Sequence, residues 1–574
     1  MGLGVLQDRV MDHVPGTTRY FDDPDRPQAA TAHSAGLKCD TSGAVPIILV
    51  PQPSDDPNDP LNWPLWKRDS ILLILSLVSV FATALGPILA ANTLTLSLYF
   101  ERTFTAVALL TGYFLLGVGV AGVLCVPSAR IWGKRHLFLC GTVLLIGSSA
   151  WGGASRSYKS LLWARIFQGV ATAPFEALVN VTVGDLYFVH ERGKRMALTN
   201  LAVFGGAFFT PILVGKITHT IGWPWSFYFV AIFLGACLPF VILFVPETAY
   251  RRSSHLNTDM AASDVEQYSK DERGFGLHTI GSDGDGPTAT QEVSGVQSRK
   301  IPTTTENQEP MNDDAQGVST PKQSYKQSLM PFNGRKSDET FLKLFLRPFP
   351  LFAHPAILWA CLIQGTLIGW TVFIGIILAA IFLGPPLFWN EVSDGYSYTG
   401  AFVGAILGFL LAGGLADWSA KYMTRKNGGI YEPEFRIVLV LPQMIIGGAG
   451  LYGFGITAAQ VTKFGWFWPV FFFALEVMGM VIGAVASSLY IVDAHRDIAI
   501  EAFTCMIMFK NFFSFGLTWS AYGWLVHSGT YKVFMVISSV QIIVCLLSVP
   551  MYMFGKRNRS FFHRHNLLKM TGLD

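Results

Sequence analysis

The chain has 574 residues, of which 51% are hydrophobic and only 14% are charged. Soluble domains contain about 25% charged residues, so the composition excludes an ordinary soluble domain and indicates an integral membrane protein. The net charge of +3 and the lack of a basic, aromatic-interleaved patch argue against a nucleic-acid partner. The seven cysteines are scattered, without a disulfide framework or a metal-binding spacing, and we expect neither a metal nor a cofactor.

Polar and apolar stretches divide the chain into five parts. Residues 1–69 are polar, show no cleavable signal peptide, and are expected to be disordered up to about residue 57. Apolar stretches of the ~20 residues that cross a bilayer follow at about 70–92, 106–128, 136–154, 160–185, 196–219 and 226–245. After a polar stretch, six more follow at about 356–383, 397–416, 436–457, 466–492, 502–526 and 531–553. The pattern predicts a tail at 1–69, a six-helix bundle at 70–250, a disordered linker at 251–350, a second six-helix bundle at 351–555 and a basic tail at 556–574.

Lysine and arginine are concentrated in the connections on one side of the predicted spans. Arg130, Arg195, Arg252 and Arg425 lie in four of these connections, and the C-terminal tail is basic as well. An excess of these residues marks cytoplasmic loops. We therefore expect both termini and the linker to be cytoplasmic.

The fourth predicted span carries two charges inside its apolar run, Arg165 and Glu176. At ~100° per residue, Gly169 and Thr172 share a helix face with both charges, and Asn180 lies near this face. An ionisable group inside the membrane costs at least ~2.5 kcal/mol and usually faces a polar interior. The two charges are roughly 16 Å apart along a helix, so each needs its own partner: another helix, water or a ligand.

The tenth and eleventh predicted spans also contain charges. Glu476 shares a face of the tenth span with Ser487, and it is either a contact to substrate or proton or a hydrogen bond between helices. Lys510 and Asn511 lie in the eleventh span, where we expect a structural role, with the lysine reaching toward the cytosol.

Several short motifs occur in an order that resembles the major facilitator superfamily, and more narrowly its fungal twelve-span drug:proton antiporters. They are the loop PSARIWGKR at 127–135, RIFQG at 165–169, DLYFVHERGKR at 185–195, PET at 246–248 and RKNGGIYEPE at 425–434. The resemblance covers about 58–560 and implies an all-α membrane protein, with twelve transmembrane helices in two six-helix bundles around a central cavity. Many members of the family couple transport to protons.

The resemblance implies a transporter and not an enzyme, and no catalytic or ATP-binding motif opposes this. We expect a monomeric, proton-coupled efflux pump of the plasma membrane that exports a small organic compound, such as a drug or a toxic secondary metabolite, by alternating access. Proton symport for uptake is the alternative, and a non-transporting membrane sensor is a third possibility. The expected partners are the lipid bilayer, the small-molecule substrate and protons.

The resemblance also assigns roles to single residues. Arg165 matches an arginine that assists proton transfer or substrate binding, although a buried arginine bonded to carbonyl groups or to Gln168 is the structural alternative. Glu176 is either a proton carrier or a packing contact. The candidates for proton coupling or substrate binding are Arg165, Glu176, Glu476, Gln168 and Asn180.

A second group of candidates belongs to the loops that gate the bundles. When the first loop is aligned on Gly133, Arg130 stands where the family has an aspartate, whereas the second-half copy of the motif keeps this acid as Asp417. Asp185 and Asp493 end the fourth and tenth spans, where we expect capping or gating contacts with nearby arginines. The gating candidates are Arg130, Gly133, Lys134, Arg135, Asp185, Asp417 and Asp493.

Overall fold

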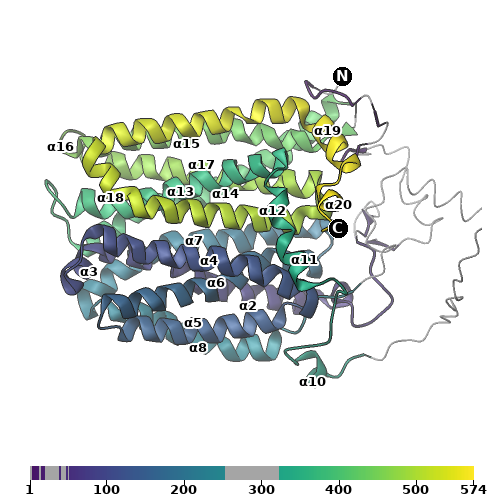
Figure 1. Cartoon of the computed structure of the whole chain (residues 1–574), viewed down its shortest axis with the longest axis horizontal. Coiled ribbons are helices and arrows are strands. Elements are labelled where there is room, and N and C mark those ends of the chain that lie inside the picture. Colours follow the sequence, from purple (N-terminus) through teal and green to yellow (C-terminus); the bar gives the residue numbers. More distant parts are fainter. Residues whose placement is uncertain are drawn as a thin grey trace, which may run out of the picture.

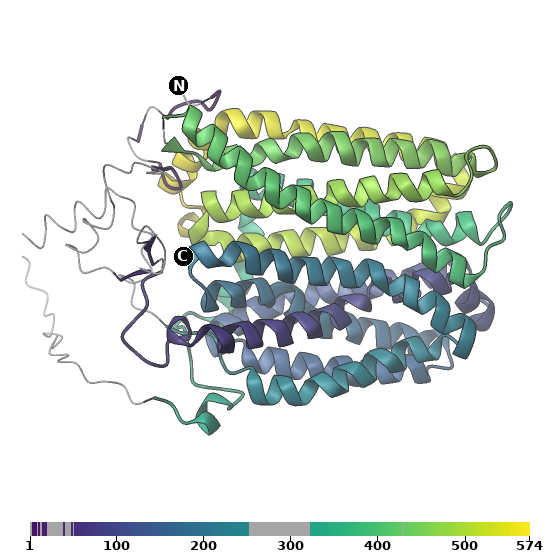
Figure 2. The same cartoon turned by 180° about the vertical axis from the view of Figure 1, so that it is seen from behind.

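The computed structural model describes residues 51–251, 322–428 and 430–573, together with 3–8, 10–11, 14–19, 38–40 and 47–49. Long helices form two bundles that lie side by side, the N-terminal half in purple to teal and the C-terminal half in green to yellow (Figure 1). Both chain termini lie at the same end of the bundles, which is also visible from behind (Figure 2). We call this end the terminal end and the opposite end the distal end.

The first bundle is built from six long helices, the first of which continues beyond a break. They are α2 (Leu65–Ala84), continued by η2 (Pro87–Asn92) and α3 (Thr93–Phe100), then α4 (Phe104–Trp132), α5 (Arg135–Ala154), α6 (Tyr158–Leu186), α7 (Val189–Ile221) and α8 (Pro224–Phe244). Side-chain caps start two of them, because Thr103 accepts from Ala106 N and Ser157 accepts from Ser160 N.

The second bundle repeats this plan. Its helices are α13 (Pro355–Phe382), α14 (Glu391–Lys426), η4 (Pro433–Leu439) leading into α15 (Val440–Ala459), α17 (Phe467–Ala494), α18 (Ala499–Leu546) and α19 (Ser548–Arg564). Eleven helical segments of the described chain are long and apolar enough to cross a membrane. The last of them contains a non-helical residue, Gly529, with φ 75° and ψ 152°, so the fold is consistent with twelve crossings.

Short elements cover the terminal end. They are β1 (Thr18–Arg19), β2 (Cys39–Asp40), β3 (Ile47–Ile48), β4 (Ile430–Tyr431), η1 (Pro60–Asn62), η5 (Arg496–Ile498), α10 (Tyr325–Ser328), α11 (Phe341–Leu346), α12 (Pro348–Leu351) and α20 (Leu567–Met570), whereas α16 (Val461–Phe464) connects α15 to α17. Strand β1 pairs antiparallel with β4, and Leu6 N donates to Met553 O at 3.0 Å, so parts of the N-terminal segment lie against the second bundle. Of the predicted linker, 252–321 lie outside the described residues, whereas 322–350 contain α10, α11 and most of α12.

Glycines allow neighbouring helices to approach closely. A Cβ at Gly169 of α6 would overlap the carbonyl oxygen of Phe114 on α4, and one at Gly404 of α14 would overlap that of Ala474 on α17. Small residues at such crossings allow the backbone-to-backbone packing that is common between membrane helices. The two bundles meet along two seams, α4 against α18 and α7 against α14.

Candidate functional site

Arg165 lies at a break in the first membrane-spanning segment. Helix α2 ends at Ala84, which leaves carbonyl groups without their helical partners. The guanidinium of Arg165 donates to Leu85 O at 2.6 Å, Gly86 O at 3.2 Å and Leu110 O at 3.3 Å. Its side chain is fully buried, and these bonds satisfy backbone groups that lipid cannot solvate.

The carboxamide of Gln168 completes this arrangement. Its Oε1 accepts from Arg165 Nη1 at 2.9 Å and its Nε2 donates to Ser148 O at 3.2 Å, while the Arg165 guanidinium lies 4.6 Å from the ring centroid of Phe114. This geometry fits the structural alternative, in which Arg165 holds α2, α4 and α6 together. A direct part of Arg165 or Gln168 in coupling stays a prediction.

Glu176, eleven residues further along α6, has its partner in the other bundle. It forms an ion pair with Lys510 of α18. The two side chains are 17% and 15% exposed, so the pair is mostly buried but retains some contact with solvent-accessible space. The ammonium group of Lys510 thus meets a carboxylate between the bundles, and the expectation that it reaches toward the cytosol stays a prediction.

Asn180, one turn beyond Glu176, connects two helices of the first bundle. Its Nδ2 donates to Asn200 Oδ1 at 3.1 Å and its Oδ1 accepts from Thr199 Oγ1 at 3.3 Å, both on α7. Glu176 and Asn180 therefore place an ion pair and an amide cluster on successive turns of α6.

Glu476 lies inside the second bundle and away from this pair. Its Oε1 accepts from Thr371 Oγ1 of α13 at 2.8 Å, and its Oε2 has no hydrogen-bond partner among the described residues. The side chain is fully buried. A substrate or proton reaches Glu476 only if α13 and α17 move, so its part in coupling stays a prediction.

The first gating loop is stabilised by the glutamate of the PET motif. Glu247 Oε1 accepts from Lys134 N and its Oε2 from Arg135 N, both at 3.0 Å, so this carboxylate caps the first turn of α5. Gly133 has φ 90°, and a Cβ at this position would overlap the Glu247 carboxylate. The Lys134 ammonium pairs with Asp185 at the end of α6. These contacts explain the spacing of the residues in the loop motif at 127–135.

Arg130 connects the two bundles at the terminal end. It pairs with Glu501 at the start of α18, and its Nε lies 3.8 Å from Glu339 Oε2. Arg347 joins the cluster, with 2.6 Å to Glu339 Oε1 and 3.7 Å to Glu501 Oε1. The arginine that replaces the family's aspartate therefore meets acidic partners, a contact that the motif alone did not indicate.

The second bundle has its own ion pairs at this end. Arg436 Nε lies 3.0 Å from Asp493 Oδ2, and the Tyr431 hydroxyl donates to the same carboxylate. Burial and the neighbouring Asp493 carboxylate raise the pKa of Tyr431, which keeps its hydroxyl protonated as a donor. Asp417 is exposed on α14, one residue from Ala416, whose carbonyl accepts from Arg436 Nη1 at 3.0 Å.

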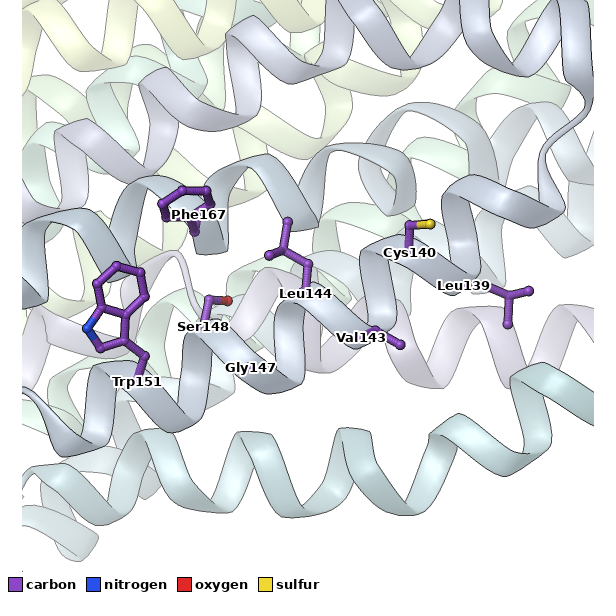
Figure 3. Close-up of a pocket in the computed structure, with 8 residues that line it drawn as sticks. All are labelled: Leu139, Cys140, Val143, Leu144, Gly147, Ser148, Trp151 and Phe167. Atoms are coloured by element: carbon purple, nitrogen blue, oxygen red, sulfur yellow. The ribbon is translucent and has the colours of Figure 1, made fainter.

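An apolar groove lies on α5, with Phe167 of α6 at its edge (Figure 3). The rings of Trp151 and Phe167 are 5.8 Å apart, and both side chains are 40% exposed. The groove contains no ionisable carboxylate or amine, so it offers nothing for proton coupling and suits contact with lipid chains. It is lined by Leu139, Cys140, Val143, Leu144, Gly147, Ser148, Trp151 and Phe167.

Two bundles joined by buried charges have the arrangement of a membrane transporter, and comparison with known proteins identifies the family. The model of the Major Facilitator Superfamily matches residues 71–509. The chain belongs to the Major Facilitator Superfamily. The predicted family and its all-α, two-bundle fold are confirmed, and the family indicates a multi-pass membrane transporter and not an enzyme.

Two relatives of this superfamily member are fungal proteins. Protein HOL1 of Saccharomyces cerevisiae is 24% identical, over 96% of each chain. The multidrug transporter TPO1_2 of Candida glabrata is 27% identical, over 34% of each chain. Among solved structures, the proton:xylose symporter XylE shares the fold with a TM-score of 0.54 at 13% identity, over 85% of this chain and 96% of that one.

Proposed function

We propose that this superfamily transporter is coupled to protons and exports a small organic compound, with the ion pair of Glu176 and Lys510 as its switch. The pair supports this role because it joins α6 of one bundle to α18 of the other. Alternating access requires the bundles to move against each other, and a contact between them that a proton can break couples that movement to the proton gradient. Asn180 would contribute a polar group to the adjacent substrate path.

The proposed cycle follows from the charge of Glu176. While its carboxylate is ionised, it attracts the Lys510 ammonium, an attraction of about 4 kcal/mol at ~4 Å and an effective dielectric constant of ~20. A proton that binds the carboxylate removes this attraction, and the bundles then separate at the level of the pair. Release of the proton on the other side restores the pair. A substrate with a charged group competes for either partner, and this competition exchanges substrate for protons.

The side to which each end faces is also part of the proposal. The terminal end carries Arg130, Lys134, Arg436 and Arg559 in its helix ends and connections. An excess of basic residues near the ends of the spans favours the cytoplasmic side. We place the terminal end in the cytoplasm and the distal end outside the plasma membrane, so that protons enter from the distal end.

The substrate class rests on resemblance. The similarity to a fungal multidrug transporter favours a drug or a toxic secondary metabolite over a nutrient, and we propose outward transport for the same reason. A proton symporter would use the same ion pair in the opposite direction, with substrate and proton entering together.

A two-step experiment tests the function. Mass spectrometry first compares the metabolites of cells with and without the chain, and identifies a compound whose level inside the cells changes when the chain is absent. Inside-out vesicles then receive this compound under an interior-acid gradient. Accumulation in wild-type vesicles supports export, accumulation under an interior-alkaline gradient shows symport, and no flux in either gradient contradicts a transporter.

Variants connect the flux to the ion pair. Glu176→Gln and Lys510→Met should lose the gradient-driven accumulation. Glu101→Gln, which changes an exposed carboxylate, is the matched control and should keep it. If Glu176→Gln protein at normal abundance transports with the wild-type pH dependence, the pair is not the switch.

A further inference from the structure

Asp394 is a buried carboxylate near the distal end, in the first turn of α14. Its side chain is 0% exposed, and neither Oδ1 nor Oδ2 has a hydrogen-bond partner among the described residues. Its backbone is satisfied, since its N–H donates to Asn390 O at 3.0 Å and its carbonyl accepts from Ser397 Oγ at 2.6 Å. The missing partners therefore concern the carboxylate alone.

The titratable groups around Asp394 give it no positive charge. Glu391 of the same helix is the nearest acid; its Oε1 accepts from Thr95 Oγ1 at 2.7 Å and its Oε2 lies 4.0 Å from His219 Nδ1 of α7. The hydroxyls of Tyr398 and Tyr522 donate elsewhere, to carbonyl groups of α13 at 2.8 and 2.6 Å. In the part of the chain that the structure describes, no lysine or arginine forms an ion pair with Asp394.

Asp394 also adjoins a close contact between the bundles. A Cβ on the next residue, Gly395, would lie 2.5 Å from Pro211 O and 3.4 Å from Gly215 Cα of α7. A Cβ on Gly215 would in turn overlap Glu391 O. The backbones of α7 and α14 are therefore packed without intervening side chains. Any separation of the bundles at the distal end must part these helices one residue from Asp394.

We propose that Asp394 is a proton-binding site at the distal seam, which holds a proton while α7 and α14 are packed and loses it when they part. An ionised carboxylate without donors is strongly disfavoured inside a protein, and the nearby Glu391 adds repulsion. Water that enters between the separated helices solvates the carboxylate and lets it ionise. The step is a simple exchange, in which the carboxylic acid gives its proton to water and recovers it before the seam closes.

This site is distinct from the switch at Glu176, although its part in transport rests on the proposed function. If protons enter from the distal end, Asp394 must take up a proton before that end closes. The two carboxylates then act at different levels of the membrane. Asp394 is protonated when the distal seam is closed, and Glu176 controls the contact between α6 and α18.

Infrared spectroscopy of the full chain in lipid nanodiscs tests the protonation directly. Asp394→Asn preserves the shape of the neutral acid, and Glu101→Gln is the control. The wild-type spectrum minus the Asp394→Asn spectrum should contain a protonated-carboxyl band at neutral pH, whereas the control difference should contain only a carboxylate band. An ionised carboxylate band in the Asp394 difference overturns the proposal.

Hydrogen exchange followed by mass spectrometry tests the link to the seam. After correction for intrinsic exchange, peptides that cover 391–400 should exchange faster in the wild-type protein as the medium becomes alkaline. Asp394→Asn should lose this pH response, and an unchanged response overturns the proposal. If Asp394→Asn does not fold, the absence of any pH response in the wild-type peptides at this seam also overturns the proposal. Neither measurement uses a substrate, so both remain decisive if the flux experiments contradict the proposed function.

Discussion

A double-mutant cycle on Glu176 and Lys510 tests whether the two charges interact across the bundles. Removal of one partner from a fully buried ion pair costs about 3–5 kcal/mol, whereas an exposed pair contributes about 0.2–1 kcal/mol. The side chains here are 17% and 15% exposed, so we expect Glu176→Gln and Lys510→Met each to cost about 2 kcal/mol of unfolding free energy. The double variant leaves no unpaired charge and should cost about 1 kcal/mol, which gives a coupling energy of roughly 3 kcal/mol.

Reversible unfolding of the purified protein in mixed micelles, with an increasing fraction of denaturing detergent, measures these free energies. The 15 tryptophans provide the fluorescence signal. Glu101→Gln should stay within about 0.5 kcal/mol of the wild type, as substitutions at exposed positions usually do. If the two single costs add to the double cost within about 0.5 kcal/mol, the charges do not interact and the reasoning fails.

Three further predictions concern packing, the terminal end and pH. Gly169→Ala forces α6 away from the Phe114 carbonyl and should cost about 1–3 kcal/mol; an unchanged melting temperature contradicts this crossing. Arg130→Glu places a third carboxylate beside Glu501 and Glu339 and should lower the melting temperature, whereas an unchanged melting temperature would exclude the contact. Burial lowers the pKa of His354 to about 4, below the ordinary value of about 6.5. The unfolded state therefore binds a proton at this histidine first as the pH falls through 6.5. The thermal unfolding midpoint, measured down to pH 4, should fall more steeply with decreasing pH for the wild type than for His354→Asn. Equal slopes for the two proteins would contradict this.

Much of the fold could be predicted because the length and low polarity of each apolar run match the thickness and the apolar interior of a bilayer. The run at about 160–185 corresponds to α6, Tyr158–Leu186. The run at about 397–416 predicted only the middle of α14, which begins at Glu391 and ends at Lys426, since the helix continues into polar residues at both ends. The first run also concealed a break, where Gly86 and Pro87 end regular α-helix.

The sequence predicted candidate residues on each helix, but not which residues of different helices meet. Helical spacing placed Glu176 on a polar face, but its partner Lys510 lies in the other bundle, and the docking of the bundles decides which faces meet. Asp394 was missed because it precedes the predicted start of its span, so its polarity suggested a loop. An acidic residue just before an apolar run was the signal that could have identified it.

The proton count per transported molecule tests the central claim most directly. Purified wild-type and Glu176→Gln proteins are reconstituted in liposomes, and a pH-sensitive dye records proton movement during transport of the compound that the metabolite comparison identifies. The account predicts that the wild type moves protons in the direction opposite to the compound. It also predicts that Glu176→Gln lets the compound cross the membrane without moving protons. Equal proton movement per molecule in both proteins would contradict it.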